Sequence, residues 1–336
     1  MKNLAKIFAS LLCIGCFCIA GLSAYGYSPT NKNTNFRNQT TAYDTLPKVY
    51  MTTDISPEGL MKVYKALGRD LKGKVAVKLS TGEPGGSNYL SPDLIKELVQ
   101  SLHGTIVECN TAYHGKRDST AKSEQVAIDH GFAAIAPVDI MDSSGSISLP
   151  FPNGKRIQED FVGDHITRYN SFLILSHFKG HIMAGFGGAL KNMSIGIASA
   201  EGKAWIHSGG TSKTNPWGGQ QDAFLEAMAE ADGAVMNYLG DNVAYVNVMN
   251  KLSIDCDCSS HPAPPQINDI GILASLDPIA LDKACVDLIY TKTDSVKSAP
   301  LRQRIESRHG MHLLNYAEEL GLGSQKYELI NIDKRE

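Results

Sequence analysis

The 336-residue sequence has almost no excess of charge and no basic run. Its 32 lysines and arginines are balanced by 35 aspartates and glutamates, which gives a formal net charge of -3 at pH 7. Proteins that bind nucleic acid carry a basic patch or stripe, because phosphate contacts supply much of their affinity. We therefore expect no nucleic-acid partner. The sequence also contains no internal repeat, and after its first 24 residues it contains no apolar run long enough to span a membrane.

Several catalytic motifs are absent as well. The glycine-rich turn at residues 80–86 lacks the spacing of a P-loop or of a dinucleotide-binding fingerprint. No G-x-S-x-G motif is present, which excludes an esterase built on a nucleophile elbow. There is no C-x2-C-x2-C-x3-C run, so the chain has no motif for a self-contained ferredoxin-type iron-sulfur cluster.

Cysteine is too scarce for a disulfide scaffold. Three of the seven cysteines lie in the first 24 residues, and the other four are Cys109, Cys256, Cys258 and Cys285. A C-x-C pair that bridges to itself closes a strained ring. We therefore expect Cys256 and Cys258 to bind a metal such as zinc, iron or copper, or to pair with a third cysteine. A buried or disulfide-linked pair is the alternative.

The first 24 residues have the layout of a bacterial secretory signal. Lys2 and Lys6 precede an uncharged apolar run at residues 7–20, and small residues follow up to Ala24. This layout predicts cleavage after Ala24 and export to the periplasm or the cell surface. Lipoprotein processing at Cys16 is a second interpretation, in which a lipid anchor would be the only link to a membrane.

The rest of the chain is predicted to form a polar tether at residues 25–45 and one α/β domain at residues 46–336. Short apolar runs alternate with helical patterns along this domain. The alternation predicts a mostly parallel sheet with helices on both faces, in one large domain or two interleaved lobes. Strands are expected at residues 49–51, 75–79, 105–109, 138–140, 172–175, 243–248, 270–274 and 327–332.

Residues 175–208 concentrate three histidines and three lysines among glycine, alanine and apolar residues. They follow the predicted buried strand at 172–175, and open α/β sheets bind ligands just beyond the carboxyl ends of their strands. The first polar residues after this strand are His177, Lys179 and His181, and the last histidine of the segment is His207.

A glycine-rich turn and a predicted helix start lie in the middle of the same segment. Glycine allows a backbone to approach a ligand closely. The residues predicted to bind a cofactor are Gly185, Gly187, Gly188, Lys191 and Asn192. In the alternative interpretation, the glycines only let a helix lie close to the sheet.

Two more polar clusters follow predicted strands, at residues 110–117 and 255–261. Parallel strands bring such loops together at one edge of a sheet. Imidazoles bind metals or exchange protons near neutral pH, and a desolvated lysine can form a covalent link to a carbonyl or thiocarbonyl carbon. The candidate catalytic residues are His114, His181 and Lys191, and the candidate metal ligands are His177, His207, Cys256 and Cys258.

The segments VECNTAYHGKRDST, LSHFKGH, GFGGALKN, GKAWIHS and DCDC, taken together, resemble the family named domain of unknown function 362. Members of that family often carry or lie beside ferredoxin-like iron-sulfur modules. The resemblance therefore implies redox or metal chemistry, with a separate ferredoxin-like protein as a partner. This sequence lacks the cysteine-rich insert, so the cluster itself is not implied.

The order His114, His181, Lys191 and His207, with glycines before the lysine, resembles the lactate racemase family. That resemblance implies that Lys191 holds a nickel-pincer nucleotide covalently and that His207 coordinates the nickel. His114 and His181 would then exchange protons with a 2-hydroxy acid. The metals under consideration are thus iron, zinc and nickel.

These observations predict an exported enzyme, metal-dependent or redox-linked, that acts on a small anionic substrate at a histidine and lysine site. Lys78, Lys179 and Arg117 are expected to supply the counter-charge to that substrate. A competing hypothesis is an exported protein that binds a metal or a small anion without turnover. A racemase or epimerase of 2-hydroxy acids is a further alternative.

Overall fold

The computed structural model describes residues 45–259 and 261–333. The predicted signal peptide, the lipidation site at Cys16 and all but the last residue of the predicted tether lie outside the described residues. No helix in the described ranges has the length and hydropathy needed to cross a membrane.

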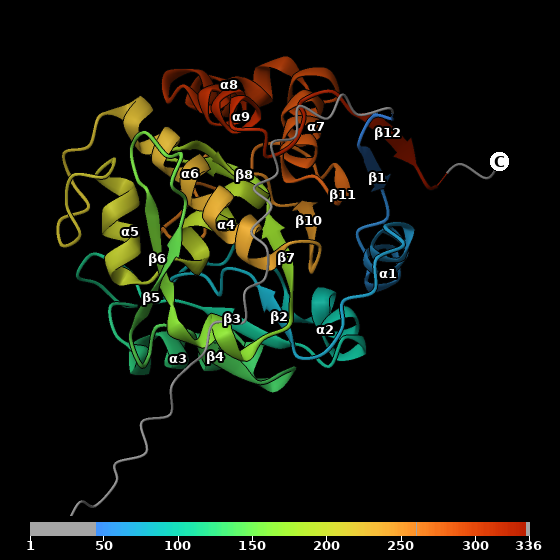
Figure 1. Ribbon diagram of the computed structural model, residues 1–336. Coiled ribbons are helices and arrows are strands. Elements are labelled where there is room, and N and C mark those ends of the chain that lie inside the picture. The colour runs from blue at the N-terminus through green and yellow to red at the C-terminus, as the bar shows by residue number, and fades with distance from the viewer. Residues whose placement is uncertain (1–44, 260, 334–336) are drawn as a thin grey trace, which may run out of the picture. The chain divides into compact units, whose positions relative to one another are not determined.

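An eight-stranded sheet forms the centre of the fold, in the order β12-β1-β11-β10-β7-β2-β3-β4 (Figure 1). Only β11 runs antiparallel to its neighbours β1 and β10, so the predicted mostly parallel sheet is confirmed. The strand expected at residues 49–51 is β1, and it lies between β11 and β12, not at an edge of the sheet. The strands of this sheet are β1 (Lys48–Thr52), β2 (Val75–Lys78), β3 (Thr105–Glu108), β4 (Val138–Ile140), β7 (Ser171–His177), β10 (Val243–Met249), β11 (Gly271–Ser275) and β12 (Glu328–Asn331).

Helices cover both faces of the sheet, as the sequence predicts. Successive side chains of a strand point to opposite faces. Leu173 and Leu175 therefore pack with α1 to α3, whereas Phe172 and Ile174 pack with α4 to α9. The helices are α1 (Pro57–Ala66), α2 (Pro92–Ser101), α3 (Thr120–Asp129), α4 (Ala189–Ile197), α5 (Ala200–His207), α6 (Gln221–Leu239), α7 (Pro278–Thr291), α8 (Ser295–Ser307) and α9 (Gly310–Glu319), with short 3₁₀ turns at Phe132–Ala134 and Asp164–Arg168.

Local sequence signals account for several of these boundaries. Ser56 caps α1, where its side chain accepts a hydrogen bond from the Gly59 backbone N–H, and Pro57 occupies the first helical position. Asp277 caps α7 in the same way and is also followed by a proline. Each of these two helices therefore begins at a proline that directly follows a capping side chain.

The order of the strands creates a crevice between β2 and β7. From β2 the chain moves through β3 to β4, and it then returns to the other side of β2 to form β7 and β10. Such a reversal leaves an opening at the carboxyl ends of the strands, which is where open α/β sheets bind ligands. The hairpin of β8 (Lys179–His181) and β9 (Gly185–Gly187) follows β7 directly at this edge, while β5 (Ser146–Pro150) and β6 (Glu159–Gly163) form a second hairpin.

Candidate functional site

A cavity of about 470 Å³ lies at the carboxyl ends of the central strands. Its wall combines all three polar clusters that the sequence places after strands. The side chains around it include Lys78, Glu108, Tyr113, Arg117, His177, Lys179, His181, Lys191, Asn192, Lys203, His207, Trp217, Cys256, Asp257, Cys258 and Arg308. A volume of this size suits a small-molecule ligand.

The part of the wall that follows β2 and β3 is a network of ion pairs. Lys78 Nζ lies 3.0 Å from Glu108 Oε2, and Arg117 Nε lies 2.6 Å from Glu83 Oε2. Burial alone would raise the pKa of Glu108, but the positive charges of Lys78 and Arg117 hold it below its usual value. The counter-charge that Lys78 and Arg117 were expected to offer a substrate is thus already used by protein carboxylates.

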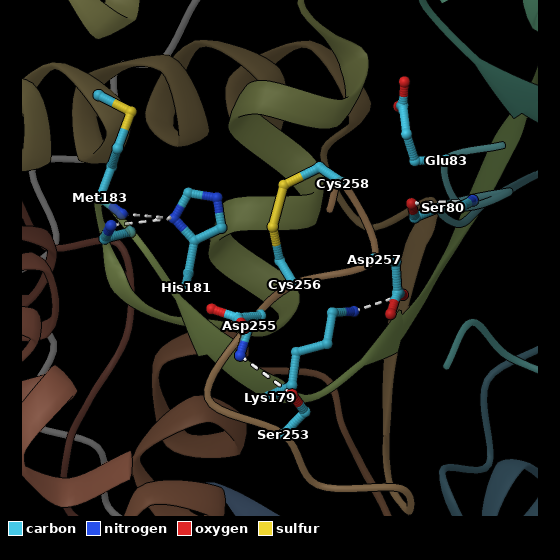
Figure 2. Close-up of a disulfide and its surroundings, with 12 residues drawn as sticks. Ser80, Glu83, Lys179, His181, Met183, Ser253, Asp255, Cys256, Asp257 and Cys258 are labelled. Carbon is cyan, nitrogen blue, oxygen red and sulfur yellow. Dashed lines mark hydrogen bonds and ion pairs between the residues drawn. A yellow bond between two sulfur atoms is a disulfide. The ribbon is translucent and has the colours of Figure 1, made fainter. Parts of the chain in front are cut away.

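Lys179 is paired in the same manner. Its Nζ lies 2.5 Å from Asp257 Oδ2 and also donates to the backbone carbonyl of His177, at 2.8 Å (Figure 2). Burial would raise the pKa of Asp257, yet Lys179 and His177 lower it well below the usual value. Asp257 is therefore an anion, and it neutralises Lys179.

His177 has no lone pair available for a metal. Its Nδ1 lies 3.0 Å from Asp257 Oδ1, and its Nε2 lies 2.6 Å from the backbone carbonyl oxygen of Asn250. Both partners are hydrogen-bond acceptors, so both ring nitrogens are engaged and neither is free to bind a metal. The prediction that His177 is a metal ligand disagrees with this geometry, because ligation needs a nitrogen lone pair.

In His207, the last residue of α5, only one ring nitrogen is engaged in a hydrogen bond within the described residues. Its Nδ1–H donates to the Lys203 carbonyl at 2.7 Å, and its ring stacks on Phe224 with the ring centroids 5.1 Å apart. Burial, with the nearby charges of Lys191 and Lys203, lowers the pKa of His207 to about 4. The ring is therefore neutral near pH 7, with a lone pair on Nε2, as a metal ligand or a general base requires.

His181 is fixed in the other tautomer. Its Nδ1 accepts hydrogen bonds from the backbone N–H groups of Met183, at 3.2 Å, and Ala184, at 3.0 Å, so its proton lies on Nε2 (Figure 2). Burial, followed by the charges of Lys191 and His207, holds its pKa well below the usual value. His181 is thus a neutral hydrogen-bond donor at the cavity wall.

Cys256 and Cys258 form a disulfide with each other. The alternative of a disulfide-linked pair is therefore confirmed, and the expected pairing with a third cysteine is wrong. His181 and the two sulfurs nevertheless form a group of three metal-ligating side chains whose ligand atoms lie within 4.8 Å of one another. A disulfide offers no thiolate, and Nε2 of His181 carries a proton, so the metal roles predicted for Cys256 and Cys258 require at least reduction of the pair.

The amine of Lys191 lies at the cavity wall. Among the described residues its Nζ has no hydrogen-bond or ion-pair partner, and the side chain lines the cavity. Burial, followed by the charges of Lys179 and Lys78, lowers its pKa to about 7. An amine with this pKa is substantially unprotonated near neutral pH.

The start of α4 holds Lys191 in place. Asp282 accepts hydrogen bonds from the backbone N–H groups of Ala189, at 2.7 Å, and Leu190, at 3.0 Å. A Cβ on Gly188 would lie 2.2 Å from Asp282 Oδ1, so this close approach requires glycine. One of the predicted cofactor-binding glycines therefore serves to fit the helix start against α7.

The remaining predicted residues of this segment divide into lining and structural positions. Gly187, like Gly188, lines the cavity, whereas Gly185 lies outside the lining at the hairpin turn, with a φ of +83°. Asn192 lines the cavity, but its amide is occupied. It donates to the carbonyls of Lys78 and Leu175 and so joins β2 to β7 across the crevice.

Sequence reasoning missed Lys203 as a site residue. Its Nζ is buried at the cavity wall, and the Ala198 carbonyl is its one hydrogen-bond acceptor within the described residues; no carboxylate there pairs with it. Lys203 precedes His207 by four residues on α5. The i, i+4 spacing places both on one face of the helix, and this was the signal that could have identified it.

His114 does not join the cluster. Its side chain is fully exposed and lies 3.6 Å from Asp118, outside the cavity lining, and its neighbour Tyr113 lines the cavity instead. Lys191 and His207, to which the racemase resemblance assigns anchoring and ligating roles, both line the cavity. The proton exchange it implies for His114 does not fit, so the predicted quartet is not assembled.

Comparison with known proteins places the chain in a family. The model of the family described as Domain of unknown function (DUF362) matches residues 75–287, which is more than half of the sequence. The chain belongs to this family. The resemblance seen in its motifs is thereby confirmed. The matched range of this DUF362 protein contains β2, β3, β4, β7, β10 and β11 of the sheet and almost every residue of the cavity wall.

Solved structures resemble the DUF362 protein more distantly. The lactate racemase apoprotein from Thermoanaerobacterium thermosaccharolyticum has 15% identity and a TM-score of 0.41, and the alignment covers 71% of this chain and 56% of that one. A Thermotoga maritima protein from a structural genomics consortium has 14% identity and a TM-score of 0.38, with 68% and 57% covered. The chain thus spans little more than half of either structure, and a likeness this low bears on no reaction or ligand. No curated protein matches the sequence.

Proposed function

We propose that this DUF362 protein is an enzyme that binds a small anionic carbonyl compound in the cavity and forms a covalent link to it through Lys191. The observation that carries the proposal is the position of the Lys191 amine, which faces the cavity and has no partner in the described part of the chain. Unpaired lysines in cationic, desolvated surroundings are activated as nucleophiles for carbonyl carbons.

The charge of the cavity wall supports an anionic substrate. Six basic side chains line the cavity, and only Glu108 and Asp257 are acidic. Three of the basic residues are held by carboxylates, as described above. The other three, Lys191, Lys203 and Arg308, have no carboxylate partner within the described ranges. The charges of Lys203 and Arg308 are therefore available to a bound anion, and the Lys191 amine is available to its carbonyl carbon.

The two histidines supply complementary proton chemistry. In the proposed reaction the Lys191 amine attacks the carbonyl carbon, a C–N bond forms, and the electron pair of the C=O double bond moves to oxygen. The Nε2 lone pair of His207 takes the proton that the amine loses, and Nε2–H of His181 donates a hydrogen bond to the oxygen or carboxylate of the substrate. His207 then returns that proton to the oxygen, the oxygen leaves as water with the second proton of the amine, and a neutral imine remains on Lys191.

Reductive trapping tests this reaction. The protein would be incubated with glyoxylate or pyruvate and sodium cyanoborohydride near neutral pH, and the adduct located by intact mass and peptide mapping. We expect one stable adduct at Lys191, none in Lys191→Arg, and an unchanged yield in Lys122→Arg, which alters an exposed lysine outside the cavity. Acetaldehyde, which has no charge, should give much less adduct than the two acids.

The adduct assay, combined with calorimetry on Lys191→Ala, distinguishes an enzyme from a binding protein. If no adduct forms, and calorimetry shows that Lys191→Ala binds the anions as tightly as the unaltered protein, the enzyme proposal is overturned. The alternative of a small-anion-binding protein without catalysis would then be the better account. An adduct on several exposed lysines in place of Lys191 would also contradict the proposal.

A further inference from the structure

The disulfide between Cys256 and Cys258 forms part of the cavity wall. Both residues line the cavity; Cys256 is 5% exposed, whereas Cys258 is partly exposed. Figure 2 shows the disulfide beside the ring of His181, with the ring nitrogen that is not bonded to the backbone on the disulfide side. Small molecules that enter the cavity can therefore reach the sulfur of Cys258.

The disulfide contributes little to holding the chain together. It joins residues only two positions apart, and a disulfide that closes a short loop removes little entropy from the unfolded chain. The same segment is fixed by other contacts, since Asp257 binds Lys179 and Asp255 accepts a hydrogen bond from the Ala263 backbone N–H. A structural role does not explain why this bond lies at the cavity surface.

The surroundings favour a thiolate at this position. Asp257, which lies between the two cysteines, is neutralised by Lys179, and a ring nitrogen of His181 lies within 4.8 Å of the sulfurs. Nearby cations and hydrogen-bond donors stabilise thiolates. Cys109 is a useful contrast, because it is buried and its pKa is raised to about 12, mainly by burial.

We propose that the Cys256–Cys258 disulfide is a redox-active site that a small thiol reduces within the cavity. The deprotonated sulfur of the small thiol attacks Cys258 Sγ and forms a new S–S bond with it. The bond between Cys258 and Cys256 breaks, and Cys256 leaves with the electron pair. A second thiol attacks the mixed disulfide, releases Cys258 and is oxidised to the small-molecule disulfide. The protons of the two thiols end on the two cysteines. Nε2–H of His181 stabilises the leaving sulfur by a hydrogen bond and transfers no proton.

Thiol trapping in the native protein tests the inference. Reduced glutathione would be added, the reaction quenched by alkylation, and the labelled residues identified by peptide mapping. We expect rapid labelling of Cys256 and Cys258, with the buried Cys109 and Cys285 unlabelled as internal reporters of an intact fold. If Cys256 and Cys258 are labelled only in denaturant, together with Cys109 and Cys285, the disulfide is structural and the inference is overturned.

Further variants distinguish the possible outcomes. Cys256→Ser should take up one molecule of glutathione at Cys258 from oxidised glutathione, and the absence of this adduct would contradict the inference. His181→Phe should slow reduction by about tenfold, which is the effect of losing one hydrogen bond to a charged sulfur, whereas the exposed-site control His114→Phe should not. Equal rates in these two variants would remove the role of His181. Lys122→Arg, at an exposed lysine outside the cavity, should be reduced at the normal rate.

Discussion

The cavity wall has two sides that carry similar residues in different states. The paired side comprises Lys78, Glu108, Arg117 and Glu83, in which each charge has an opposite charge within hydrogen-bonding distance. The open side comprises Lys191, Lys203 and His207 on α4 and α5, with no carboxylate partner in the described ranges. Both sides come from polar residues near glycine-rich segments, so the residue types alone do not distinguish them.

The difference shows that the presence or absence of a partner separates charged residues that support the fold from those that are available to a ligand. A buried ion pair with satisfied hydrogen bonds is costly to break, because removal of one partner leaves the other uncompensated. A cation at a cavity wall without a partner has its charge, or its nitrogen lone pair, available to a ligand. The paired side therefore holds β2 and β3 in place, and under the proposed function the open side binds the substrate.

The largest effect should follow from breaking the paired side. Glu108→Gln leaves Lys78, which is 1% exposed, without its carboxylate, and this should lower the free energy of unfolding by about 3 to 5 kcal/mol. Lys191→Met, on the open side, should change it by less than about 1 kcal/mol. Urea denaturation measures both values, and equal losses in the two variants would mean that the two sides do not differ.

A smaller effect is expected in the pH dependence of the reactivity of the Lys191 amine. Only the unprotonated amine is a nucleophile, and the pKa of Lys191 is about 7. Its rate of acylation by an amine-reactive reagent should therefore rise by up to about a hundredfold between about pH 5 and about pH 8 and then level off. Exposed Lys122, read in the same peptide map, should continue to gain reactivity above that pH. Parallel profiles for the two lysines would contradict the assignment of Lys191 to the open side.

The smallest effect should come from Lys203. Lys203→Met removes one cation that has no carboxylate partner in the described part of the chain, and the Kd of a small carboxylate such as pyruvate should rise by about tenfold, which corresponds to one charge-assisted hydrogen bond. The control Lys122→Met should leave the Kd unchanged. Calorimetry gives both constants. Unchanged binding in Lys203→Met would place the anion elsewhere in the cavity.

Much of the fold could be predicted because its signals are local. The run Phe172–Leu175 is apolar at every position since β7 is covered on both faces, and Ser56 with Pro57 marks the start of α1. The hairpin of β8 and β9 was not predicted as strands. Each of its strands has only three residues, and glycine occupies three of the six positions, so no alternation of apolar and polar side chains was available.

The sequence predicted where the candidate site lies, but not how its charged residues pair. The three polar clusters were expected at one edge of the sheet, and residues from all of them line the cavity. The partners of their charges could not be predicted, because Lys78 and Glu108 are 30 residues apart and Lys179 and Asp257 are 78 residues apart. The exposure of the His114 side chain could not be predicted either, because it depends on the path of a loop.

By itself, the sequence determined the α/β class, the family and the edge of the sheet where the polar residues gather. These follow from periodicity, capping residues and motifs, which act over short stretches of chain. Only the tertiary structure decided which lysines are neutralised and which nitrogen of each histidine carries the proton. His177, His181 and His207 are identical in the sequence, but their hydrogen-bond partners come from different segments. Protonation and pairing depend on distances of a few ångströms, and only the folded chain sets those distances.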